Sequence, residues 1–199
     1  MKKKIAAAAL IVSMLSISAM GTLAYFTDTG IAHNVITSGK VDITLIDDTE
    51  EIGKPFPDGG ITNVMPGTSV SKIVGVKNEK ASADAWVRLL VNTEFVKDLN
   101  DEVVEALDEN VISMDLSKKW TKSNGTVTIN GKEYDAYTYN EILAPNTSTE
   151  PLFEEVKFAP VMGNEYQNST LHIDVIAQAV QADNNPSITG WPAVVVSEE

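Results

Sequence analysis

Apolar and polar residues alternate along much of this chain. In residues 39–47, Val41, Ile43 and Leu45 fall on one face, while Asp42 falls on the other. A period of two is typical of a β-strand with one buried face. Comparable runs occupy residues 70–78, 85–91, 126–129, 132–140, 152–158 and 169–181.

Two Asn-Gly pairs, Asn124-Gly125 and Asn130-Gly131, flank the run at residues 126–129. Asn-Gly is a strong signal for a two-residue hairpin turn, because both turn residues need positive φ. The sequence therefore predicts a tight turn on each side of this strand.

One segment has a different period. Apolar residues recur every fourth position through residues 95–111, which favours a helix ending near Glu109, with Asn100 or Asp101 as its N-cap. The repeating residues are Phe95, Leu99, Val103, Leu107 and Val111. With about seven or eight strands, one short helical insertion and no repeated β-α unit, the pattern predicts an all-β antiparallel sandwich over residues 39–182, followed by a tail at 183–199.

The first 24 residues have the layout of an export signal. Lys2, Lys3 and Lys4 precede an apolar stretch, and the small residues Thr22 and Ala24 occupy positions −3 and −1 of a cleavage site before Tyr25. The alternative is a retained membrane anchor, because the apolar stretch approaches the length that spans a bilayer. Cleavage leaves no membrane segment in the mature chain and frees an N-terminal arm at residues 25–38.

Composition narrows the function. The mature 175 residues contain no cysteine, so the core alone must hold this exported chain together. Its charge is −16, with 12 Lys and Arg against 28 Asp and Glu, which disfavours nucleic acid as a partner. The acidic run Asp47, Asp48, Glu50 and Glu51 lacks the regular spacing of a calcium loop, so we interpret it as a solvated loop and expect no cofactor.

Four stretches together resemble the TasA/camelysin family of exported fibre proteins from Gram-positive bacteria. They are A-Y-F-T-D (24–28) with N-V-I-T-S-G-K-V-D-I-T-L (34–45), N-V-M-P-G-T…V-K-N…A-W-V-R (63–88), L-A-P-N-T-S-T-E-P-L-F-E-E-V-K-F (143–158) and L-H-I-D-V-I-A-Q-A-V-Q-A (171–182). Their order and joint occurrence carry the resemblance, and they cover most of the mature chain. The chain is shorter than the best-known fibre former, and its apolar patch at residues 191–196 has no place in the family pattern.

The resemblance implies a jelly-roll sandwich that assembles into biofilm-matrix fibres outside the cell by donor-strand exchange. The expected partner is then another copy of the same chain. An anchoring or assembly accessory protein is a further candidate partner. The apolar arm residues Tyr25, Phe26, Ile31 and Val35 are the candidates to fill pockets on the next subunit. Folding of the arm onto its own sheet uses the same edge chemistry and remains an alternative, as does a monomeric surface or adhesion module.

The rival class is an enzyme, because the camelysin name implies a surface metallopeptidase. Zinc peptidases typically hold the metal with two histidines one helical turn apart, beside a glutamate base. This chain has only His33 and His172, and neither begins such a motif. No G-x-S-x-G nucleophile elbow occurs either. We therefore expect no catalytic and no metal site.

The cleavage site gives the first testable prediction. N-terminal sequencing of secreted protein should begin Y-F-T-D, because the bond between Ala24 and Tyr25 follows the small-residue pair. A mature chain that keeps Lys2 would contradict the prediction and would leave the arm tethered.

Overall fold

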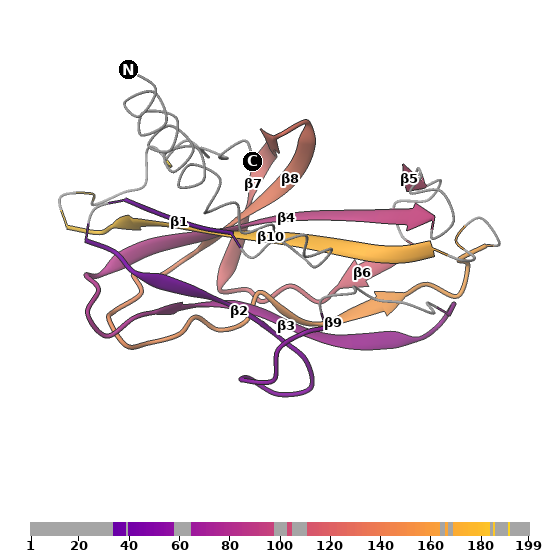
Figure 1. Cartoon of the computed structure of the whole chain (residues 1–199), viewed down its shortest axis with the longest axis horizontal. Helices are drawn as coiled ribbons and strands as arrows, with labels where there is room; N and C mark the ends of the chain where they lie inside the picture. The colour runs from indigo at the N-terminus through magenta and orange to yellow at the C-terminus, as the bar shows by residue number, and fades with distance from the viewer. Residues whose placement is uncertain are drawn as a thin grey trace, which may run out of the picture.

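The computed structural model describes residues 34–38, 40–57, 65–97, 103–104, 111–163, 166, 169–183, 185 and 191. These residues form two β-sheets packed face to face (Figure 1). The larger sheet has the order β1 (Asn34–Ser38), β10 (Ser169–Gln181), β4 (Ala85–Lys97), β8 (Lys132–Tyr139) and β7 (Trp120–Ile129), with β5 (Val103–Val104) beside part of β4. The smaller sheet has the order β2 (Ile43–Asp48), β3 (Ser69–Asn78), β9 (Phe153–Phe158) and β6 (Ile112–Met114).

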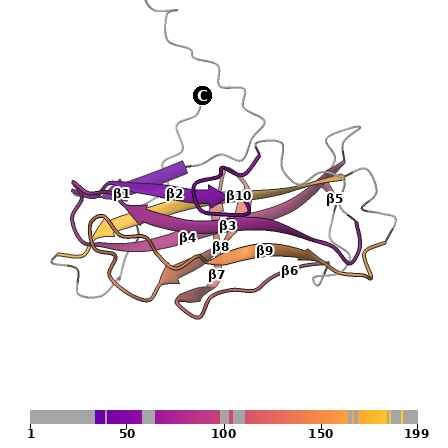
Figure 2. The same cartoon turned by 90° about the horizontal axis from the view of Figure 1, so that it is seen from below.

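The predicted all-β, jelly-roll-like sandwich is confirmed, because the chain passes repeatedly between the two sheets. Figure 2 shows the four strands of the smaller sheet side by side in this order. All described pairings are antiparallel except one, since β1 runs parallel to β10. This exception concerns the N-terminal arm.

The main core lies between the sheets. Alternate residues of the central strands face it, and Val74, Leu89, Val156 and Ile173 are almost completely buried there. A second, smaller cluster lies on the outer face of the larger sheet, where the β7–β8 hairpin covers β4 and β10. Its buried members are Leu90, Ile129, Tyr134, Ala136 and Ile176. The middle of β10 is therefore buried on both faces.

The two Asn-Gly pairs have different structures. Asn130 and Gly131 both adopt positive φ, at 49° and 79°, and join β7 to β8 as predicted. The turn predicted at Asn124-Gly125 is wrong, because this pair lies within β7, where the pairing register shifts between Lys122 and Thr126. Gly125 alone of that pair has positive φ, which suits a bulge and not a two-residue hairpin turn.

The predicted helix is wrong at the residues that the structure describes. Phe95 belongs to β4, and Val103 and Val104 form β5, which pairs with β4. Residues 98–102 and 105–110 of that stretch lie outside the described residues. Phe95 and Val111 both face the core, so their apolar character reflects burial from strand and loop positions.

The acidic run that begins with the last two residues of β2 is only partly solvated, which corrects the sequence interpretation of a solvated loop. Glu50 and Glu51 are exposed, but Asp47 and Asp48 are buried. Oδ2 of Asp48 accepts a hydrogen bond of 2.6 Å from the backbone N–H of Gly53 and so closes the loop after β2.

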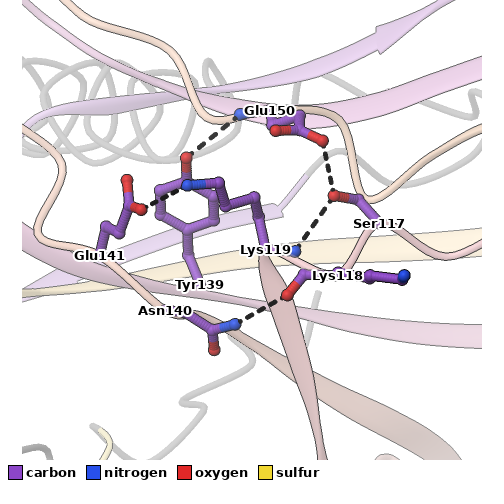
Figure 3. A network of polar contacts seen from close by, with 7 residues as sticks. All are labelled: Ser117, Lys118, Lys119, Tyr139, Asn140, Glu141 and Glu150. Carbon is purple, nitrogen blue, oxygen red and sulfur yellow. Dashed lines mark hydrogen bonds and ion pairs between the residues drawn. The ribbon is translucent and has the colours of Figure 1, made fainter.

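Polar contacts tie the connection between β6 and β7 to the connection between β8 and β9 (Figure 3). Glu150 accepts a hydrogen bond from Ser117 and donates its backbone N–H to the hydroxyl of Tyr139. Lys119 forms an ion pair with Glu141, and Asn140 donates to the carbonyl of Lys118. The segment before β7 is thereby joined to the segment after β8.

Arg88 lies on the outer face of β4, because its neighbours Val87 and Leu89 face the main core. Its Nε donates to the side-chain amide oxygen of Gln178 on β10, and its guanidinium lies 4.7 Å from the ring centre of Trp191. Burial lowers the pKa of Arg88 to about 10. Trp191 is the one described residue of the C-terminal apolar patch, and this contact places it against the larger sheet.

The buried centre of β4 gives a stability prediction. Leu89→Ala should lower the free energy of unfolding by about 2–5 kcal/mol, because Leu89 is fully buried and its truncation leaves a cavity between the sheets. Val161→Ala is the matched control, since Val161 is 71% exposed and should change little. Urea denaturation measures both variants, and equal midpoints would contradict the core assignment.

Candidate subunit-binding edge

Strand β10 forms the centre of the candidate site. It pairs with β4 along its whole length, from Ser169 opposite Lys97 to Gln181 opposite Ala85. Its alternate residues Leu171 and Ile173 face the main core. The hydrogen bonds to β4 occupy one side of the β10 backbone and hold the strand in place. The other side of β10 is therefore an edge of well-defined position, at which a further strand can pair.

That other edge is only partly covered. Strand β1 pairs with β10 in parallel from Asn34 opposite Ile176 to Ser38 opposite Val180. Residues 169–175 of β10 lie beyond this pairing, and no other described strand runs along their free side. Backbone N–H and C=O groups on such an edge are available to pair with another extended chain.

Of the predicted arm residues, Val35 alone lies within the described chain. It belongs to β1 and is in register with Ala177 of β10. Tyr25, Phe26 and Ile31 lie outside the described residues, as do the cleavage-site residue Ala24 and the whole predicted signal. The structure thus brings one predicted arm residue to the edge of β10 and does not address the others.

The outer face of the same part of β10 carries a charged cluster. His172 and Asp174 lie opposite Glu94 and Asn92 of β4, and Lys132 of β8 reaches across them. The Lys132 ammonium lies 2.5 Å from a carboxylate oxygen of Glu94 and 3.2 Å from one of Asp174. Burial opposes the charge of Lys132, but these two carboxylates outweigh it and raise the pKa of the amine.

This cluster does not fit a zinc site. The carboxylates nearest His172 in the strand register already share one ammonium, which would repel a divalent cation at the same place. Among the described residues no group of three or more His, Asp or Glu side chains lies close enough to hold a metal ion. His33, the other predicted candidate, lies outside them.

Sequence reasoning missed two features of the described chain. One is the partly covered edge of β10, because a strand pattern does not reveal which neighbour a strand will have. The other is the burial of Lys72 on β3. Its position did carry a signal, since Lys72 alternates in phase with Val74 and Val76, whose side chains face the core.

In the part of the chain that the structure describes, no helix is both long and apolar enough to cross a membrane. The family model described as camelysin metallo-endopeptidase matches residues 1–144. No curated protein and no solved structure matches the chain. The family match includes the first two of the four stretches that carry the resemblance, at residues 24–45 and 63–88, and confirms the resemblance to the TasA/camelysin family. Because it spans well over half of the sequence, the protein belongs to the camelysin metallo-endopeptidase family.

Proposed function

We propose that this chain is a structural subunit of extracellular biofilm-matrix fibres, which polymerises head to tail by donating its N-terminal strand to the next subunit. Membership of the camelysin family indicates an extracellular or cell-surface protein. The observation that carries the proposal is the edge of β10, which β1 covers over only part of its length. An incomplete edge on an otherwise well-packed sheet suits the addition of a strand.

The register of β1 supports this assignment. Because β1 and β10 are parallel and in step, each residue preceding Asn34 would add one position towards Ser169. Continued without a shift, this register sets Thr27 opposite Ser169. The arm that follows the predicted cleavage site therefore has the length needed to complete the edge. Main-chain hydrogen bonds would supply affinity, and the apolar arm residues would supply specificity.

The same strand can complete its own sheet or that of a neighbour. Within one chain, β1 in the larger sheet connects to β2 in the smaller sheet through residues 39–42, which include Gly39. In the proposed exchange these linking residues would rearrange, and β1 would make the same contacts with a second copy. Head-to-tail exchange of this kind is heterologous, and it produces filaments when the rotation between subunits does not close a ring.

Arm deletion tests the proposal directly. Mature protein lacking residues 25–35 should remain a folded monomer, and electron microscopy should show no fibres. Phe26→Asp with Ile31→Asp should also prevent assembly, because an unpaired charge in an apolar pocket is costly. Gly30→Asp is the matched control, since the continued register sets residue 30 opposite His172 on the outer face of β10, where an added charge stays solvated and assembly should persist.

Two further measurements test the same proposal, and two outcomes would contradict it. A synthetic arm peptide should raise the melting temperature of the deleted protein, because it binds only the native state. High salt should speed growth of the intact protein by screening subunits of charge near −16. Fibres of unchanged morphology without the arm would refute donor-strand exchange, and an intact protein that stays monomeric would indicate a surface or adhesion module.

The family description supports a second candidate, a surface metallopeptidase. The described residues do not favour it, because the carboxylates near His172 are committed to Lys132. We expect purified mature protein to leave casein intact and chelators to have no effect. Stoichiometric zinc binding, with proteolysis abolished by His33→Ala or His172→Ala and unaffected by Asn92→Ala, would instead establish the peptidase.

A further inference from the structure

Lys72 of β3 is an unusual lysine. Its side chain has no exposed surface, whereas every other described lysine in an ion pair keeps at least 42% of its side chain exposed. The Lys72 amine contacts Asp47 and the ring of Phe56, a member of the main core, so the side chain projects into the space between the sheets. A charged amine at such a position requires a chemical reason.

Its neighbour is a buried carboxyl group. Asp47 of β2 lies opposite Val74, which makes it the diagonal cross-strand neighbour of Lys72 on the inward face. Nζ of Lys72 lies 2.5 Å from Oδ1 of Asp47, whose side chain is 1% exposed. An amine and a carboxyl group, which together can form an amide, are thus held in contact away from solvent.

An aromatic ring closes this site. Nζ of Lys72 lies 4.0 Å from the ring centre of Phe56, which is itself buried. The backbone N–H of Phe56 donates a hydrogen bond of 2.9 Å to the carbonyl oxygen of Asp47, and this bond fixes the loop after β2 over the pair. The arrangement excludes water and holds both side chains in place.

The local electrostatics favour a reactive amine. Burial lowers the pKa of Lys72, and the charge of Asp47 opposes this effect only in part. A desolvated lysine is more easily deprotonated, and the neutral amine is the nucleophilic form. Transfer of one proton from the ammonium to the adjacent carboxylate gives a neutral amine and a neutral carboxylic acid without bringing any charge from solvent.

We propose that Lys72 and Asp47 form an intramolecular isopeptide bond between β3 and β2. After the proton transfer, the lone pair of Nζ attacks Cγ of Asp47. The tetrahedral intermediate then loses one carboxyl oxygen as water, which carries one proton from the acid and one from the nitrogen. The ammonium and the carboxylate thus become one amide and one water molecule, with no oxidant, reductant or added reagent.

Condensation of a free amine with a free carboxylate is unfavourable in water. It can proceed here because the fold holds the two side chains in contact and away from solvent. Holding the two groups in contact replaces a bimolecular step by a unimolecular one. The dry site also removes the water that would hydrolyse the product. The bond would close a loop between residues 25 positions apart in a chain that has no cysteine for a disulfide.

Mass spectrometry of folded, mature wild-type protein tests the proposal. The intact mass should be lower than the sequence mass by one water molecule. Trypsin does not cleave Lys54-Pro55, so digestion of denatured protein should leave residues 41–77 as one peptide that is uncut after Lys72. Succinimide formation at Asp58-Gly59 would also remove one water molecule. Trypsin would then still cleave after Lys72, and this distinguishes the two reactions.

Variants test which residues form the bond. Lys72→Arg keeps the positive charge but removes the amine, and it should restore the full mass, as should Asp47→Ala. Lys122→Arg alters an exposed pair with Asp135 and should retain the water loss. Wild-type protein of full mass, with free Lys72 and Asp47 in the digest, would overturn the proposal without reference to how any variant folds.

Discussion

The antiparallel pairing of β4 with β10 is the interaction on which the rest of this structure depends. Both strands are fully paired over the same span, so their register fixes which residues face the main core and which face outward. Inward residues such as Leu89 and Ile173 meet the smaller sheet. Outward residues such as Leu90 and Ile176 are covered by the β7–β8 hairpin, so the pair is buried on both faces along its middle. A shift of one residue would exchange these two sets of side chains.

This central pair also determines where the sheet remains open. β4 has neighbours on both sides, whereas β10 has β4 on one side and only the short β1 on the other. Charged residues lie on the outer face of β10 within residues 169–175. Their side chains project away from the backbone N–H and C=O groups at the strand's edge and leave those groups accessible. In the proposed assembly, a donated strand would therefore use the same hydrogen-bonding positions on β10 as β1 does within one chain.

The sequence predicted several strands closely, because their apolar residues alternate and turn residues bound them. The bounds of β10 were predicted in full, and those of β3 and β9 to within one residue. The prediction failed where apolar spacing has two explanations: Phe95 and Val111 recur at helical intervals, but both are core residues outside a helix. It also failed for Asp47, because an acidic residue looks solvated until its buried cross-strand lysine is known. Of the candidate arm, Val35 was located by the structure, and no pattern within residues 25–38 specified a parallel partner.

The parallel orientation of β1 and β10 has a mechanical consequence. Tension applied along a strand that lies beside its partner loads all the hydrogen bonds between them in shear. These hydrogen bonds must then break together. In a hairpin that is pulled open from its ends, by contrast, they break one at a time. In a filament linked through β1, the force between subunits would pass through this shear-loaded ladder into β10, and from β10 into the full-length pairing with β4. The strand pair that organises the fold would thus also bear the load of the fibre.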